Sequence, residues 1–170
     1  MLPKLQPADL LLYKVKPRSP LVSKLVAWGE RLLGEQNGKQ AFSHVAIVDE
    51  NGTGFYEAYW PAVRWRPLHW SVENKTEQIE VFRLPGLSPG QLADILSYAR
   101  RHVGERYDIL AILTFGMVTN HHAAVCSEYV WRAYHAAGIT LCPWEKLVSP
   151  DEISGSKFLQ REGAEKLQTA

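Results

Sequence analysis

Residues 123–138 read AAVCSEYVWRAYHAAG and predict an amphipathic helix that begins at a cysteine. Small or apolar side chains recur at spacings of four, three and four residues, the period of one helix face, at Cys126, Val130, Ala133 and Ala137. Glu128 lies early in this helix, and Gly138 follows it as a left-handed stop. The first turn of a helix carries unpaired N–H groups and partial positive charge, which stabilise a thiolate. Cys126 is therefore a candidate nucleophile, and the alternative is that it is a small buried core residue.

The composition fits one domain, because 170 residues can bury a core large enough to fold alone. We expect a single domain over residues 1–170, with its core at about 9–155 and residues 156–170 as a frayed helix or tail. The formal net charge is +1, and Lys, Arg, Asp and Glu are interspersed without a basic stripe. A nucleic acid or an anionic membrane is therefore not the expected partner.

The chain has two cysteines, Cys126 and Cys142, too few for a secreted disulfide scaffold, although one bridge between them stays open. The N-terminus has no uninterrupted apolar region of the signal-peptide type, and no run approaches eighteen apolar residues. We expect no integral membrane segment and a cytoplasmic location, with delivery to the envelope or by a phage as the alternative.

Three Ser-Pro pairs predict helix starts, since serine suits the N-cap and proline the first helical position. They begin at Ser19, Ser88 and Ser149, and the last two also carry Gln91 and Glu152 three residues later, as a capping box requires. The middle helix has one apolar face, made of Leu92, Ile95, Leu96, Ala99 and Val103.

Short apolar or alternating runs predict strands at residues 10–15, 43–49, 54–60, 63–67 and 78–83. A polar loop at 34–40 is a candidate lid. Strands flanked by helices indicate an α+β fold with a mostly antiparallel sheet.

The second and third of these strands surround Asn51-Gly52, a strong hairpin signal. If these two residues form the turn, Ala46 faces Glu57 and His44 faces Tyr59. His44 and Glu57 then lie on one face as diagonal neighbours, with Cβ atoms about 7 Å apart. A slip of one residue would separate them, so the inference depends on the turn.

Acyl transfer by a cysteine needs a thiolate, an imidazole that accepts and returns a proton, and a polar group that orients the imidazole. Cys126, His44 and Glu57 supply these three types. A carboxylate beside the imidazole also favours a thiolate–imidazolium pair at neutral pH. Taken singly, His44 could be an ordinary strand residue and Glu57 a solvated one.

Four segments together resemble the permuted branch of the NlpC-type papain-like cysteine peptidases and amidases, specifically the YaeF/YiiX type, with lecithin:retinol acyltransferase relatives more distant. They are Ser43-His44-Val-Ala-Ile-Val, Tyr56-Glu57-Ala58 with Val63-Arg64, Gly104-Glu-Arg-Tyr107-Asp108, and Val125-Cys126-Ser-Glu-Tyr-Val-Trp131. In that branch the histidine strand precedes the cysteine helix, the reverse of the order in papain. The resemblance covers roughly residues 9–155 and implies a papain-like α+β fold.

The resemblance implies that Cys126 is the nucleophile, His44 the base and Glu57 the third member of a triad. It also implies that Tyr107 lies beside the thiol and donates to the reacting carbonyl, although a packing role for Tyr107 is equally open. The backbone N–H of Cys126 would be a second donor to the oxyanion. One departure from the family pattern is Asn120-His121-His122 before the cysteine, which leaves the pocket wall undefined.

A metal site is the competing chemical hypothesis, because His122 and Cys126 are four residues apart and His121 is adjacent. We expect a loop there instead, with no metal and no cofactor, since no CxxC or HExxH pattern is present. Other histidines, at positions 69, 102 and 135, are expected at the surface or at helix ends. Cys142 is expected to be a packing residue.

The predicted function is a thiol hydrolase, an amidase or peptidase that acts on a small peptide or acyl amide. Cell-wall stem peptides and fatty-acyl amides or esters are the candidate substrates, and Trp60, Trp65 and Trp70 could form an apolar wall for an acyl chain. The alternatives are a lipid acyltransferase or thioesterase with the same triad, and a binding or structural module without catalysis. The oligomeric state and the natural substrate stay open.

Overall fold

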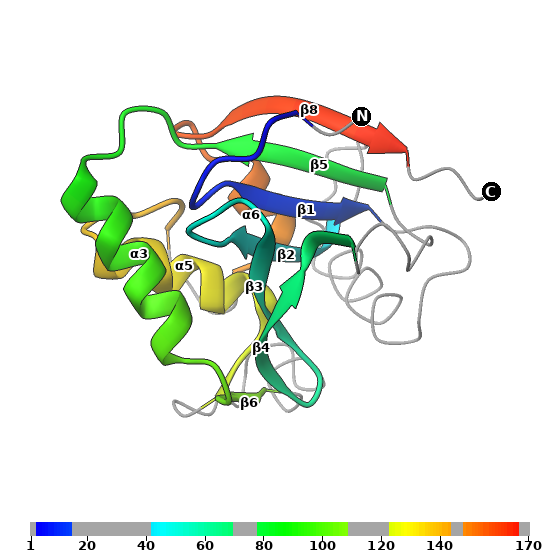
Figure 1. Cartoon of the computed structure of the whole chain (residues 1–170), viewed down its shortest axis with the longest axis vertical. Helices are drawn as coiled ribbons and strands as arrows, with labels where there is room; N and C mark the ends of the chain where they lie inside the picture. Colours follow the sequence, from blue (N-terminus) through cyan, green and yellow to red (C-terminus); the bar gives the residue numbers. More distant parts are fainter. Residues whose placement is uncertain (1–2, 15–41, 70–77, 109–122, 144–147, 167–170) are drawn as a thin grey trace.

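A computed structural model describes residues 3–14, 42–69, 78–108, 123–143 and 148–166 of the chain. This part contains an eight-stranded sheet and three helices (Figure 1). The strands are β1 Leu10–Lys14, β2 Phe42–Val48, β3 Gly54–Tyr59, β4 Ala62–Pro67, β5 Gln78–Arg83, β6 Arg106–Tyr107, β7 Ala123–Ala124 and β8 Gln160–Lys166. The helices are α3 Pro89–Arg101, α5 Cys126–Ala136 and α6 Pro150–Ser154.

The strand order in the sheet is β7-β6-β4-β3-β2-β1-β5-β8. Neighbouring strands are antiparallel except for β6 and β7, which are parallel. The predicted α+β class with a mostly antiparallel sheet is therefore confirmed. The five expected strands form the central part of the sheet, and β6, β7 and β8 extend it at both edges.

The sequence predicts a frayed helix or tail at residues 156–170, and this prediction is wrong for residues 160–166. Residues 160–166 form the edge strand β8, which pairs with β5 along its whole length. Arg161 also binds the buried Glu80, with an Nε–Oε2 distance of 2.8 Å. The sequence of β8, QREGAEK, has no apolar alternation because an edge strand is held by backbone pairing and by charged contacts.

Two of the three predicted helix starts are confirmed, since Ser88 and Ser149 each form a complete capping box with Gln91 and Glu152. Helix α3 ends at Arg101, so Val103 lies beyond it and is exposed, contrary to the expected apolar face. The helix expected after Ser19 and the loop at 34–40 lie outside the described residues.

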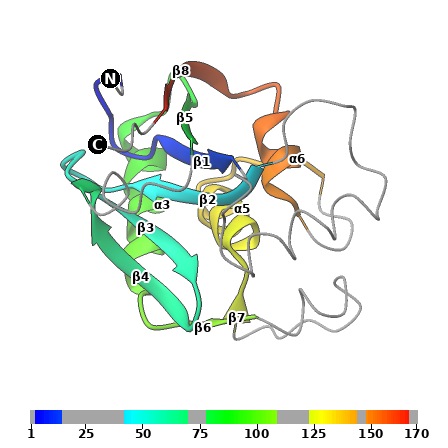
Figure 2. The same cartoon turned by 90° about the vertical axis from the view of Figure 1, so that its right-hand side faces the viewer.

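Helices α3 and α5 contact each other, and α5 also contacts β2 and β3 (Figures 1 and 2). The larger core cluster lies between these helices and the sheet, and it includes Leu10, Leu12, Val45, Ile47, Ile95, Tyr129 and Tyr134. A smaller cluster on alternate strand positions includes Leu11, Ala46, Val48, Phe55 and Val81. The sheet therefore buries side chains on both faces, which explains why β1 and β2 have no polar alternation.

The hairpin between β2 and β3 has the predicted register but a different turn. Ile47 pairs with Tyr56 and Val48 with Phe55, as expected. Gly52 has a positive φ of 68°, whereas Asn51 does not, and a two-residue type I′ turn needs both. The backbone N–H of Gly52 instead bonds to the carbonyl of Asp49. The longer loop is still centred between residues 51 and 52, so the pairs next to the loop stay the same.

We expect Gly54→Ala to destabilise the β3–β4 pair. A methyl group at Gly54 would lie 2.5 Å from the Trp65 ring and 2.6 Å from the carbonyl oxygen of Arg66, so backbone must move. The free energy of unfolding should fall by about 1–3 kcal/mol, which denaturant titration would measure.

The matched control for Gly54→Ala is Gly90→Ala in α3, where the nearest atom to the added methyl is 3.9 Å away. This substitution should leave stability unchanged or raise it by up to about 1 kcal/mol. Equal stability of the two variants would show that the Trp65 contact does not constrain this strand pair.

Candidate active site

The predicted contact between His44 on β2 and Glu57 on β3 is present in the structure. Imidazole Nε2 and carboxylate Oε2 are 2.8 Å apart, and both side chains are buried. The ladder between the strands, however, stops at Ile47 and Tyr56, so the expected pairs of Ala46 with Glu57 and His44 with Tyr59 do not form. Helix α5 contacts both strands.

Cys126 is the first residue of α5, as the sequence predicts, and it is buried. Its N-cap is Val125 in extended conformation, which has no side-chain group that could cap the helix. The thiol lies close enough to His44 to affect the protonation of the imidazole. Nε2 of the ring faces Glu57, so Nδ1 is the ring nitrogen that is not bonded to this carboxylate.

The electrostatics of His44 favour its protonated form. Burial by itself lowers the pKa of the imidazolium, but the charge and hydrogen bonding of Cys126 and then of Glu57 outweigh this effect. The pKa of His44 is therefore raised well above 6.5. An imidazolium beside the sulfur stabilises the thiolate form of a cysteine.

The carboxylate of Glu57 has three partners. Burial by itself raises the pKa of this carboxyl, but the hydrogen bonds and charges of His44 and Arg64 hold the pKa below 4.5. On β4, the Nε atoms of Arg64 and Arg66 each lie 2.9 Å from Glu57 Oε1. Glu57 is therefore ionised at neutral pH, and both of its oxygens are bound.

Two tyrosine rings also flank the imidazole of His44. Tyr13, its partner on β1, has its ring centroid 5.3 Å away, and Tyr59 lies edge-on at 5.6 Å. Neither tyrosine was predicted from the sequence as part of the site, and nor was Arg66. Tyr59 and Arg66 could have been predicted from the strand pattern. Tyr59 lies two residues after Glu57, and Arg66 lies two residues after Arg64, the partner of Glu57, so their side chains lie on the same face of the sheet.

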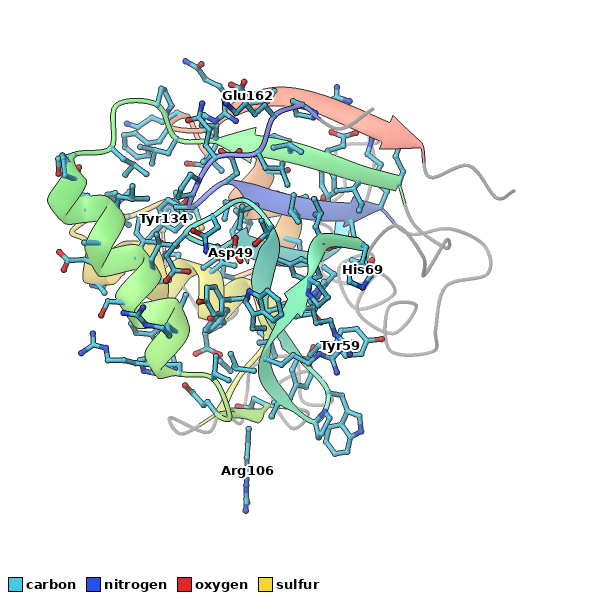
Figure 3. All side chains as sticks on the ribbon, in the orientation of Figure 1. Asp49, Tyr59, His69, Arg106, Tyr134 and Glu162 are labelled. Atoms are coloured by element: carbon cyan, nitrogen blue, oxygen red, sulfur yellow. The ribbon has the colours of Figure 1, made fainter. Side chains whose placement is uncertain are left out.

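Tyr107 on β6 lies near Cys126, Tyr59 and Glu57. Burial, followed by the negative charge of Cys126, raises the pKa of its hydroxyl well above 10, so the hydroxyl keeps its proton and can donate. Its neighbour Arg106 points away from the body of the molecule (Figure 3), as alternation along a strand requires.

Strands β6 and β7 connect Tyr107 to the segment before Cys126. Tyr107 pairs with Ala124, and the backbone N–H of Asp108 bonds to the Ala124 carbonyl at 3.2 Å. One residue separates Ala124 from the first residue of α5. This short parallel pair therefore fixes the start of the helix next to Tyr107.

The first turn of α5 also contains the buried Glu128. Its Oε1 accepts from Arg132 at 2.7 Å, four residues later in the helix. Burial raises the pKa of Glu128 more than Arg132 and the Val125 backbone lower it. From the sequence, Glu128 was a helix signal and part of the segment that carries the family resemblance, and no role in the site was predicted for it.

Cys142 differs from Cys126 in its surroundings. It is a buried free thiol, and burial raises its pKa to about 11. The Trp131 indole donates to its backbone carbonyl at 2.9 Å. These contacts indicate a thiol that stays protonated at neutral pH.

Two other described histidines pack on aromatic rings of their own helices. His102 caps α3 and stacks on Tyr98 at 3.8 Å, while His135 stacks on Trp131 at 4.5 Å. Trp60 and Trp65 are both about half exposed, at 53% and 45%. Trp70 lies outside the described residues, as do His121 and His122 of the competing metal hypothesis.

Within the described ranges, no three His, Cys, Asp or Glu side chains converge in a way that could hold a metal ion. Over the same residues, no helix combines the length and the apolar character that a membrane span requires.

Comparison with known proteins supports the fold. No protein family matches the sequence, and no curated protein does. Among solved structures, the chain is similar to the crystal structure of a protein from Escherichia coli O157:H7 described as metalloprotein YiiX, with a TM-score of 0.72. The two are 21% identical, and the match covers 95% of this chain and 98% of the other. The predicted YiiX-type fold is therefore confirmed.

Proposed function

We propose that this YiiX-type fold is a thiol hydrolase, an amidase or peptidase that forms an acyl-enzyme on Cys126. The observation that carries the proposal is the position of one buried imidazole, His44, which interacts with Cys126 and bonds to Glu57 at 2.8 Å. Nucleophile, base and orienting carboxylate are the three parts that this chemistry needs.

In the first step, the Cys126 thiolate attacks the carbonyl carbon of the scissile amide, and a C–S bond forms as the carbonyl π bond opens. The His44 imidazolium then gives its proton to the leaving nitrogen while the C–N bond breaks. The raised pKa of His44 keeps this proton available at neutral pH. An amine leaves, and a thioester with Cys126 remains.

Two donors would stabilise the oxyanion of the tetrahedral intermediate. The backbone N–H of Cys126 is one, because the first N–H groups of a helix have no intrahelical partner. The protonated hydroxyl of Tyr107 is the other. Neutral His44 then takes a proton from water, which attacks the thioester, and the acid and the free thiol are released.

The proposed substrates are amide bonds in short peptides, including cell-wall fragments, or fatty-acyl amides and esters. Trp60 follows β3, the strand that carries Glu57, and Trp65 lies on the neighbouring strand β4. Both tryptophans keep large exposed surfaces, which could contact an acyl chain. The metal in the description of the E. coli protein is not carried over to this site, because His44 and two arginines already occupy the Glu57 oxygens.

The experiment that tests the proposal is alkylation by iodoacetamide at pH 6, followed by peptide mass spectrometry. Cys126 should react at least about 10-fold faster than Cys142, because its imidazolium partner favours the thiolate. Cys142 is the internal control, since its pKa is raised to about 11. Equal rates at the two cysteines would contradict an activated thiol and weaken every enzymatic proposal.

The second candidate is a lipid acyltransferase or thioesterase with the same triad, which the exposed Trp60 and Trp65 favour. Mass spectrometry of the acyl-enzyme with a panel of peptide amides and lipid esters separates the two. Transfer of the acyl group to an added amine, rather than to water, would identify an acyltransferase. A binding module would form no acyl-enzyme with any substrate of the panel.

A further inference from the structure

The Glu57 carboxylate lies between the imidazole on one side and two guanidinium groups on the other. Its Oε2 is 2.8 Å from His44 Nε2, and its Oε1 is 2.9 Å from Nε of both Arg64 and Arg66. Glu57 itself is 1% exposed, and the arginine side chains are 25% and 22% exposed. One buried negative charge thus faces two positive charges besides the imidazole.

The sheet register explains this arrangement. Arg64 pairs directly with Glu57 across β3 and β4, and Arg66 is two residues further along on the same face. The Arg64 guanidinium carbon also lies 4.4 Å from the centre of the Tyr59 ring, which stacks edge-on to His44. Backbone pairing and ring contacts therefore hold the arginine groups in place, as a positioning role requires.

We propose that Arg64 and Arg66 form a two-arginine clamp that holds the Glu57 carboxylate in the orientation His44 needs and sets the pH range in which the Cys126–His44 pair is active. The proposal rests on the proposed thiol-hydrolase function. The two arginines are positioning residues that act through Glu57, and neither needs to contact a substrate.

The direction of the effect follows from charge. A positive charge close to an acid favours loss of its proton, so removal of an arginine charge should make every neighbouring group hold its proton to higher pH. The groups that face the pair are Glu57 and Tyr59 on β3, the arginines on β4, Tyr13 on β1, Tyr107 on β6 and Cys126 on α5. The hydroxyl of Tyr107 keeps its proton, because burial and then the charge of Cys126 raise its pKa. The arginines and Glu57 carry the charges that act on His44 through the Glu57 carboxylate. The buried carboxyls of Asp108, next to Tyr107, and Glu128, two residues after Cys126, are further acidic groups near the pair, and every variant of the test leaves them in place.

The test is the pH profile of Cys126 alkylation by iodoacetamide, which needs no substrate. Arg64→Gln and Arg66→Gln should each move the acidic midpoint of the profile upward by about half a unit to one unit, and slow alkylation about 3- to 10-fold below that midpoint. Arg64→Lys and Arg66→Lys keep the charge and should leave the midpoint close to the wild-type value. Arg101→Gln on α3, an exposed side chain bonded to the Ser97 carbonyl, controls for net charge.

The outcomes separate the two proposals. An ordinary alkylation profile for Cys126 in the wild-type protein would overturn the proposed function itself. An activated wild-type thiol whose midpoint is unchanged in both glutamine variants, or shifted equally by lysine and glutamine, would overturn the clamp alone. Circular dichroism confirms that each variant is folded, and the lysine variants keep the test decisive if a glutamine variant does not fold.

Discussion

Replacing Cys126 with alanine is expected to reduce turnover of a substrate amide or ester by at least about 10³-fold and to abolish acyl-enzyme formation. The reason is that no other described nucleophile interacts with the His44 imidazole. Steady-state kinetics and intact-protein mass spectrometry with the same substrate would measure both effects. The fold should survive, because alanine at the first helical position removes only one buried sulfur atom.

Cys142→Ala is the matched control for Cys126→Ala. It removes the same sulfur atom from the other buried free cysteine, which has no imidazole partner among the described residues. Turnover should stay within about twofold of wild type, apart from any loss of folded protein by cavity formation. Retained turnover in the Cys126 variant, or equal loss in both variants, would exclude Cys126 as the nucleophile.

Replacing Glu57 with glutamine is expected to reduce kcat/KM by about 10²- to 10⁴-fold, because a neutral amide neither stabilises the imidazolium nor fixes the ring orientation in the same way. Arg64 and Arg66 would also lose their carboxylate partner. Because these arginines stay about one quarter exposed, we expect a loss of about 1–3 kcal/mol in the free energy of unfolding, less than for a fully buried pair.

The pH dependence of stability provides an independent measurement for Glu57. Its pKa in the folded state is held below 4.5, so its contribution to stability is present above that value and is lost as pH falls through the lower folded pKa. Denaturant unfolding between pH 6 and pH 3 should therefore show a smaller loss of stability in Glu57→Gln than in wild type. An equal loss of unfolding free energy between pH 6 and pH 3 in the two proteins would contradict a charged Glu57 in the folded state.

The sequence predicted the contact between His44 and Glu57 because strand parity depends only on where the hairpin is centred. The segment between the paired residues Val48 and Phe55 is longer than the expected two-residue turn, but it has the same centre, so the two side chains share a face. Cys126 at the start of α5 was predictable for a similar reason, since helical spacing and Gly138 define both ends of that helix.

The remaining features depend on contacts that leave no local pattern. Strands β6 and β7 have two residues each, too few for any periodicity, and yet they place Tyr107 near Cys126. Strand β8 is polar and is defined by its pairing with β5. The short length of the β2–β3 ladder was also not predictable, because the hairpin signal specifies which residues face each other but not how far the pairing extends.

The parallel pair of β6 and β7 has a consequence for motion within the site. Tyr107 and the residue two before Cys126 belong to one backbone ladder, whereas His44 and Glu57 belong to the central strands. A displacement of that ladder would carry sulfur and hydroxyl together and preserve their spacing. In the proposed mechanism, such a displacement would change the gap between sulfur and imidazole, and with it proton transfer, before it changed the spacing of the two proposed oxyanion donors.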